Sequence, residues 1–179
     1  MAYSADSFVA DEQPTTAKWN KLWSNDASFN DGSGIANFAF NTTAISNPYK
    51  FSAYRSAAQN TVGGSFSKIS FDTEFFDTNS NFASGTYTAP VTGFYNFWWG
   101  SHVASTPDAV AALYKNGAIL RWGIEQLPVG SAGSNGSAFV QATASDTFEL
   151  YIYTTNTVAI SVGASPLKTF FEGALSCRT

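Results

Sequence analysis

The chain has 179 residues and a formal net charge of -4 at pH 7, and 12% of its residues are charged and 16% are aromatic. The negative charge argues against nucleic acid and against an anionic membrane surface as partners. Charged residues usually make up about 25% of a globular protein, so we expect an assembly to cover part of this surface.

The cysteine content and the search for targeting signals limit the cellular settings in which the chain could work. Cys177 is the one cysteine, which excludes an intrachain disulfide. The first residues have neither the basic nor the apolar part of a secretion signal, and no apolar run is long enough to span a bilayer. We therefore expect a soluble chain that is made in the cytoplasm and leaves the cell by a route such as lysis.

Residues 1–46 are expected to form an N-terminal arm, a short helix and a linker. Pro14 and the threonines after it mark a helix start, and Trp19, Leu22 and Trp23 then fall on one helix face. A helix of about a dozen residues is marginally stable alone in water. This stripe is therefore expected to dock, either on its own domain or as an attachment helix on a larger assembly.

Residues 47–179 are predicted to form one β domain. From Tyr49 onward, short apolar runs alternate with turn signals, which is typical of an all-β sandwich. Apolar and polar residues alternate between Ile69 and Phe75, which predicts a half-buried strand. A polar loop is expected over Asp77–Ser84.

The most aromatic stretch of the chain is a predicted strand that is apolar on both faces. Because side chains alternate along a strand, Tyr95, Phe97 and Trp99 are expected on one face. Phe94 and Trp98 are expected on the other face. A second sheet can cover only one of these faces, so we expect another copy of the chain to cover the other.

The second half of the domain begins with a predicted hairpin. Asn116-Gly117 lies between two apolar runs, which is the strongest short-range signal for a β-hairpin. The returning strand reaches Ile124, and a long loop is then expected over Gly130–Ser137. Further strands are predicted near residues 138–142, 146–153, 158–162 and 170–177.

Five motifs between Tyr49 and Thr179 resemble a known family in their order and spacing. They are Phe51-Ser-Ala-Tyr-Arg, Tyr87-Thr-Ala-Pro-Val-Thr-Gly-Phe-Tyr-Asn-Phe, Leu113-Tyr-Lys-Asn-Gly, Ala144-Ser-Asp-Thr-Phe-Glu-Leu and Phe171-Glu-Gly-Ala-Leu. Together they resemble the globular head of complement component 1, subcomponent q, within the tumour necrosis factor-like superfamily. The resemblance implies a jelly-roll β-sandwich of about ten antiparallel strands that assembles as a homotrimer.

The same resemblance implies which residues form the trimer interface. In that family the strands corresponding to residues 93–99 and 146–153 lie in the sheet that faces the three-fold axis. The interface residues expected on this basis are Phe94, Trp98, Tyr151 and Tyr153.

Two further features bear on the biological setting. The chain has no collagen repeat, no secretion signal and no disulfide, so a complement or cytokine role is not expected. Residues 14–32 are similar to segments that precede trimeric heads in bacteriophage tail-fibre and minor structural proteins. The resemblance therefore favours a phage appendage.

The residue types that could carry catalysis are few. His102 is the single histidine and follows Ser101, but the sequence supplies no third group for a triad and no ligand set for zinc. Asp72, Glu74 and Asp77 could cleave a glycoside or hold calcium. Their alternation with apolar residues favours a solvated sheet face, so we expect no catalytic residue, no metal and no cofactor.

The sequence thus predicts a non-enzymatic, homotrimeric binding head of a phage or phage-like virion. Its N-terminal segment is expected to contact other virion proteins, and its loops to contact a host surface glycan or protein. The alternatives are a polysaccharide-cleaving spike and a bacterial surface or spore adhesin. The ligand-binding residues expected on loops are Ser101, His102, Asp108, Asn116, Ser134 and Asn135.

Overall fold

The computed structural model describes residues 49–103, 108–125, 132–160 and 168–179. These residues belong to one compact unit, residues 47–179. The predicted attachment helix with Trp19, Leu22 and Trp23 lies outside the described residues, so the helix and the domain boundary at residue 46 stay predictions. Within the described ranges, no helix is long and apolar enough to cross a membrane.

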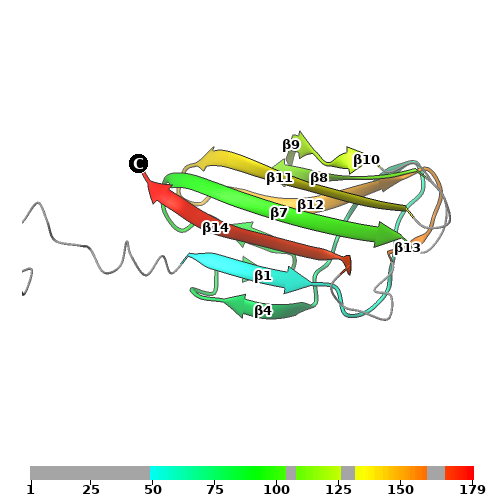
Figure 1. Ribbon diagram of the computed structural model, residues 1–179, viewed down its shortest axis with the longest axis horizontal. Helices are drawn as coiled ribbons and strands as arrows, with labels where there is room; N and C mark the ends of the chain where they lie inside the picture. The colour runs from blue at the N-terminus through cyan, green and yellow to red at the C-terminus, as the bar shows by residue number, and fades with distance from the viewer. Residues whose placement is uncertain (1–48, 104–107, 126–131, 161–167) are drawn as a thin grey trace, which may run out of the picture. The chain divides into compact units, whose positions relative to one another are not determined.

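Two antiparallel sheets form a sandwich (Figure 1). The eight-stranded sheet has the order β10-β11-β7-β14-β1-β4, with β13 paired to β7 and β2 paired to β13. Its strands are β1 (Lys50–Tyr54), β2 (Gln59–Asn60), β4 (Thr73–Asp77), β7 (Gly93–Val103), β10 (Ile124–Glu125), β11 (Ala132–Ala142), β13 (Ala159–Ile160) and β14 (Phe170–Arg178).

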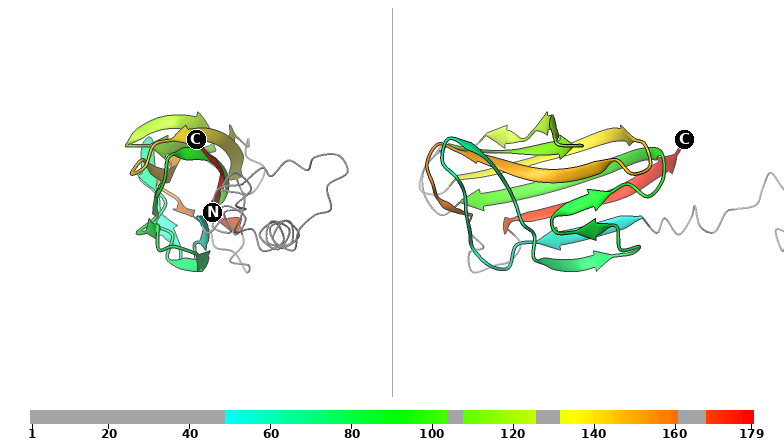
Figure 2. Two further views of the ribbon diagram at one scale, coloured as in Figure 1. Left: turned by 90° about the vertical axis from the view of Figure 1, so that its left-hand side faces the viewer. Right: turned by 180° about the vertical axis from the view of Figure 1, so that it is seen from behind.

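The six-stranded sheet has the order β5-β6-β12-β8-β9, with β3 paired to β12. Its strands are β3 (Ser65–Lys68), β5 (Phe82–Ala83), β6 (Thr86–Thr88), β8 (Ala109–Lys115), β9 (Ala118–Trp122) and β12 (Thr147–Thr154). Seen end-on, the strands of both sheets curve around a common interior (Figure 2). The predicted all-β sandwich is confirmed.

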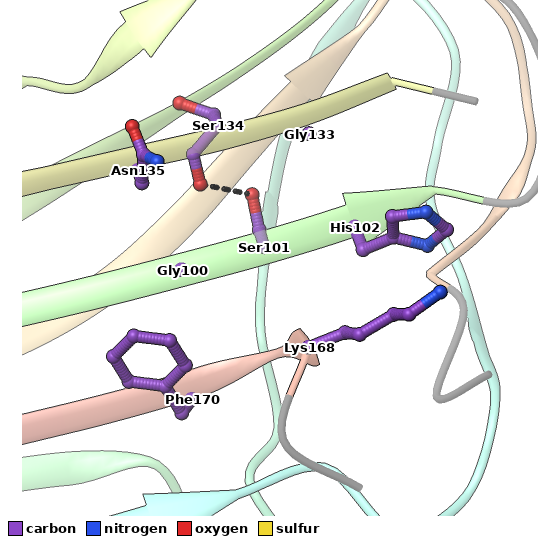
Figure 3. Close-up of a pocket in the computed structure, with 8 residues that line it drawn as sticks. All are labelled: Gly100, Ser101, His102, Gly133, Ser134, Asn135, Lys168 and Phe170. Atoms are coloured by element: carbon purple, nitrogen blue, oxygen red, sulfur yellow. Dashed lines mark hydrogen bonds between the residues drawn. The ribbon is translucent and has the colours of Figure 1, made fainter. Parts of the chain in front are cut away.

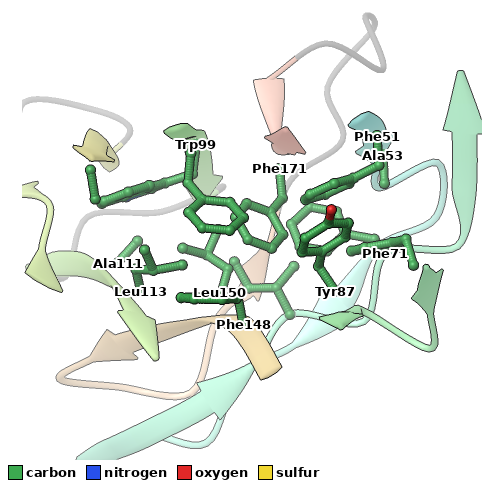
Figure 4. Packing of buried hydrophobic residues seen from close by; sticks show 14 of the residues in the cluster. Phe51, Ala53, Phe71, Tyr87, Trp99, Ala111, Leu113, Phe148, Leu150 and Phe171 are labelled. Carbon is green, nitrogen blue, oxygen red and sulfur yellow. The ribbon is translucent and has the colours of Figure 1, made fainter. Parts of the chain in front are cut away.

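The core between the sheets is built from aromatic rings (Figure 4). Tyr95, Phe97 and Trp99 of β7 point inward and are at most 1% exposed, as alternation along the strand predicts. The Phe51 ring on β1 stacks on that of Tyr87 on β6, with ring centroids 4.6 Å apart. Such rings each bury a large apolar area, so these contacts dominate the attraction between the two sheets.

The predicted hairpin is also confirmed. Asn116 and Gly117 connect β8 and β9 and have φ angles of 51° and 79°. Positive φ at both central residues defines the turn whose twist matches that of the flanking strands, and asparagine and glycine tolerate it best.

The half-buried strand predicted between Ile69 and Phe75 is wrong. β3 ends at Lys68 and β4 begins at Thr73, although the Ile69 side chain between them is fully buried. On β1, Ser52 pairs with Phe76 and the next residue pairs with Glu74. Phe75 is therefore the extra residue of a β-bulge, which re-aims its side chain, and its ring is 57% exposed.

The loop predicted over Gly130–Ser137 is wrong from residue 132 onward. Residues 132–142 form β11, which pairs along its whole length with β7. Small residues suit the first half of β11, because a Cβ on Gly136 would lie only 2.3 Å from the Trp99 ring of β7. The polar loop predicted over Asp77–Ser84 likewise contains β5, where Phe82 is buried.

The two strands expected to share the sheet at the three-fold axis lie in different sheets. β7 is in the eight-stranded sheet, whereas β12 pairs with β3, β6 and β8 in the six-stranded sheet. Tyr151 and Tyr153 thus project from the opposite side of the sandwich to Phe94 and Trp98. One flat face cannot contain all four residues.

Candidate binding groove

The outer face of the eight-stranded sheet carries exposed aromatic side chains. Trp98 on β7 is 44% exposed and Phe139 on β11 is 57% exposed. Phe139 stacks on Phe94 with ring centroids 5.5 Å apart. We call the surface formed by Phe94, Trp98 and Phe139 the outer aromatic face.

Two pairs of polar side chains on this face are joined by hydrogen bonds. Glu172 lies beside Trp98 in the register of β14 and β7, and its carboxylate accepts a hydrogen bond of 2.7 Å from the Ser52 hydroxyl. The amide of Asn96 donates to the Ser176 hydroxyl at 3.3 Å. Since these groups already have partners, the face can be covered by a second apolar surface at little desolvation cost.

A pocket of about 320 Å³ lies at the β13 end of this face (Figure 3). Gly100 leaves space on β7, and the Phe170 ring lies so close that a Cβ on Gly100 would meet it at 2.6 Å. His102 and Lys168 extend toward the same end of the pocket. The lining residues are Gly100, Ser101, His102, Gly133, Ser134, Asn135, Lys168 and Phe170.

The pocket brings together four of the six residues predicted to bind a ligand, namely Ser101, His102, Ser134 and Asn135. They come from two paired strands, β7 and β11, rather than from loops. The other two lie elsewhere. Asp108 directly precedes β8, and Asn116 in the β8–β9 turn donates its side-chain amide to Asp146 at 2.7 Å.

The environment of His102 suits hydrogen bonding rather than nucleophilic catalysis. Burial and the charge of Lys168 lower the pKa of the imidazole below its usual value, so the ring is neutral at pH 7. Its Nδ1 is buried and has no hydrogen-bond partner among the described residues. The Ser101 hydroxyl donates to the Ser134 carbonyl at 3.1 Å, and no acidic residue lines the pocket.

A second pocket of about 520 Å³ adjoins the first and shares Asn135 and Phe170 with it. Its lining residues are Trp98, Trp99, Trp122, Gly123, Ile124, Asn135, Gly136, Ser137 and Phe170. The sequence analysis did not assign Trp122, Ile124 or Phe170 to a site. The run of apolar residues that ends at Ile124 could have indicated this pocket, because an apolar run at a sheet edge is expected to be covered by other residues.

The three acidic residues considered for catalysis or calcium are spread over separate structural roles. The Asp72 carboxylate accepts hydrogen bonds from the backbone N–H groups of Ser56 at 2.7 Å and Ala57 at 3.2 Å. Asp77 accepts from the Phe82 N–H at 2.8 Å, and Glu74 is exposed. Among the described residues, no group of three His, Cys, Asp or Glu side chains could hold a metal ion.

No family model and no curated protein matches the sequence. Solved structures do match. The globular domain of the zebrafish complement 1qA protein is 16% identical with a TM-score of 0.54, over 73% of this chain and 98% of that one. The chain has the jelly-roll fold of the C1q head. The predicted all-β jelly-roll fold is thereby confirmed, whereas the trimer and the N-terminal helix stay predictions.

Two further structures share this fold and are similarly distant in sequence. Murine APRIL at pH 5.0 is 10% identical with a TM-score of 0.55, over 70% of this chain and 97% of that one. The Eiger TNF from S. frugiperda is 11% identical with a TM-score of 0.56, over 73% of this chain and 93% of that one. The C1q-like fold described here therefore spans nearly the whole of each similar domain.

Proposed function

We propose that this chain is the non-enzymatic, homotrimeric binding head of a bacteriophage or phage-like particle and attaches that particle to a host cell surface. The outer aromatic face carries this proposal. Trp98 and Phe139 expose about half of their surfaces on an otherwise packed sheet. Exposed apolar patches of this kind mark interaction sites in soluble proteins.

The occupant proposed for the outer aromatic face is a second copy of the chain. The C1q-like fold supports this choice, since the resemblance of the sequence to that family implies homotrimers. The low charged fraction of 12% supports it as well, because assembly removes surface that would otherwise need charge. Phe94, Trp98 and Phe139 would then lie between subunits.

The phage setting rests on residues 14–32, which are similar to segments of tail-fibre and minor structural proteins. The N-terminal segment would bind other virion proteins, and the trimeric head would face the host. Three identical sites on one axis raise the apparent affinity without any new contact, and the gain reaches about 10²- to 10⁴-fold. Weak individual sites are therefore sufficient for attachment.

The absence of catalysis is supported by the roles of the acidic residues. Asp72 and Asp77 hold backbone N–H groups, and cleavage of a glycoside needs a pair of carboxylates facing one substrate. A polysaccharide-cleaving spike would require Glu74 to act with a second acid in a groove. Among the described residues that line the two pockets, none is acidic.

Binding of the fluorescently labelled chain to a panel of bacterial strains tests the proposed function. We expect the parent chain to bind at least one strain and to block adsorption of the corresponding phage. Trp98→Asp, which places a charge on the outer aromatic face, is expected to bind at least 10-fold more weakly because avidity is lost.

Phe75→Ala is the control, because it removes an exposed aromatic ring from β4, the edge strand of the same sheet, which β14 and β1 separate from Trp98 on β7. Equal binding by the parent, Trp98→Asp and Phe75→Ala would contradict a trimeric attachment role. Hydrolysis of host polysaccharide by the parent, lost in Glu74→Gln, would favour the spike instead.

A further inference from the structure

A second aromatic surface covers the outer face of the six-stranded sheet, on the side opposite the outer aromatic face. Its members come from β3, β8, β9 and β12, and we call them the aromatic patch. They are Phe66, Tyr114, Trp122, Tyr151 and Tyr153. The patch is not part of either pocket described above, except that Trp122 also borders the larger one.

The rings of the patch contact one another as a continuous layer. Tyr114 stacks on Tyr151 with centroids 4.1 Å apart and planes inclined by 30°. Phe66 is the hub, because its centroid lies 5.8 Å from Tyr114, 5.3 Å from Trp122 and 5.6 Å from Tyr153. Trp122 remains 54% exposed at the border of the layer.

A small residue explains how these long side chains lie over the sheet. Ala112 on β8 is opposite both Tyr151 and Trp122 in the strand register. Ala112 is fully buried although it is not part of the core between the sheets. The rings therefore bend over Ala112 and present a broad aromatic surface to solvent.

The patch combines apolar ring faces with hydroxyl groups. Tyr151 donates to Glu149 at 3.4 Å. Among the described residues, none forms a hydrogen bond with the hydroxyl of Tyr114 or Tyr153. Both side chains are half-buried, so these hydroxyls can bind a ligand. A ligand that fits must offer polarised C–H groups to the rings and its own hydroxyls to the rim.

The charges at the rim fit a neutral ligand. Lys68 on β3 and Glu149 on β12 form an ion pair of 2.7 Å, and the Thr86 hydroxyl donates to the same Glu149 oxygen at 2.8 Å. Because these two charges cancel, the part of the rim formed by β3 and β12 offers no net charge to a phosphate, a uronic acid or a charged peptide. A purely apolar protein surface would leave the tyrosine hydroxyls without partners.

We propose that the aromatic patch binds a neutral polysaccharide. The C–H faces of pyranose rings stack on the aromatic rings, and the sugar hydroxyls bind the hydroxyls of Tyr114 and Tyr153. This inference rests on the proposed attachment role and names the ligand class for it. In a trimer whose subunits contact one another through the outer aromatic face, the aromatic patch of each subunit faces outward.

Retention of the full chain on immobilised polysaccharides tests the proposal. The probes are neutral glucan, galactan and mannan, with alginate and polygalacturonate as the charged comparison. We expect the parent to be retained on at least one neutral polymer and not on the charged ones. Phe66→Ala removes the hub of the patch from edge strand β3, and we expect it to weaken retention at least 10-fold.

Phe75→Ala is the matched control, because it also removes an aromatic ring from an edge strand, where Phe75 contacts Tyr54 at 4.6 Å. This control is expected to bind as the parent does. Tyr153→Phe keeps the ring and removes only the hydroxyl, and we expect an intermediate loss of about 2- to 5-fold, the scale of one neutral hydrogen bond. This variant is informative even if Phe66→Ala fails to fold.

Retention on no neutral polymer, retention only on the charged polymers, or equal retention of Phe66→Ala and the parent would each overturn the proposal. The bacterial binding assay is run on the same preparations. If the cells bind the parent and Phe66→Ala equally, the attachment role stands and the aromatic patch is not its site.

Discussion

The Asp146 carboxylate, just before β12, is held by three donors. Lys115 Nζ lies 2.8 Å from Oδ2, and the Asn116 side-chain amide and the Thr143 N–H each donate at 2.7 Å. Burial opposes the charge, but these interactions outweigh it and lower the pKa of the Asp146 carboxyl from 3.8 to about 2. The group therefore links the β8–β9 turn to the start of β12.

Asp146→Asn is expected to lower the free energy of unfolding by about 1 to 2 kcal/mol at pH 7. Because the folded pKa is depressed, the stabilisation is complete above about pH 4 and is lost as the pH falls through 2. The difference between parent and variant in urea unfolding should therefore shrink between pH 5 and pH 2. A difference that stays constant over this range would show that the charge of Asp146 is not the cause.

Asp72 and Glu74 lie two residues apart but differ in what they contact. Both residues are exposed, but Asp72 accepts hydrogen bonds from two backbone N–H groups and pairs with Arg55 at 3.1 Å. The sequence analysis placed both acids on one solvated strand face, and that placement is wrong for Asp72, which precedes β4. The two residues therefore form a natural comparison.

Asp72→Ala is expected to destabilise the fold by about 0.5 to 1 kcal/mol, because water replaces only part of two exposed hydrogen bonds and one ion pair. Glu74→Gln is expected to change stability by less than about 0.5 kcal/mol. Thermal unfolding of both variants checks this. Equal effects of the two substitutions would contradict the structural role of Asp72, and cell binding should be retained by both.

At the level of elements, alternation and turn chemistry predicted β7, the β8–β9 hairpin and the face that Tyr95, Phe97 and Trp99 share. These features depend on neighbours in the sequence. The second half of β11, residues 138–142, was predicted, but its first half was missed because residues 132–137 are alanine, glycine, serine and asparagine, whose strand character comes from pairing with β7. Ser101 and Ser134 line one pocket, but they lie on strands rather than on the loops where they were expected.

Gly136 shows how β11 depends on β7. Its Cα faces the Trp99 ring so closely that a Cβ would lie 2.3 Å from Cζ2 and 2.6 Å from Cε2. Gly136→Ala is therefore expected to destabilise the domain by about 1 to 3 kcal/mol through overpacking. Urea unfolding measures this, with Gly64→Ala as a comparison, since a Cβ there meets no atom within 4 Å and only the positive φ of 74° opposes it. A larger loss for Gly64→Ala would contradict the proposed packing constraint.

At the scale of the whole molecule, the sequence predicted the fold class because its motifs are distributed along the entire domain. The resemblance implied that the strands at residues 93–99 and 146–153 share one sheet, so Tyr151 and Tyr153 were grouped with Phe94 and Trp98. In the structure, β7 and β12 lie in different sheets. The sandwich separates these two pairs into an outer aromatic face and an aromatic patch.

The domain boundary gives a prediction for the whole chain. A chain that begins at Asn47 is expected to fold and to have the same number of subunits as the parent, because the core residues from Phe51 to Leu175 pack against one another between the two sheets. Circular dichroism and light scattering check this. Aggregation of the shortened chain would mean that the head depends on residues 1–46.

The central claim is that the outer aromatic face joins three copies of the chain. Light scattering of the purified protein at micromolar concentration tests this most directly. We predict a mass of three times the 19.2 kDa chain for the parent and for Phe75→Ala. Trp98→Asp is expected to shift the mass toward one chain, because an unpaired buried charge costs several kcal/mol. A parent mass of 19.2 kDa, or a trimer unaffected by Trp98→Asp, would contradict the account.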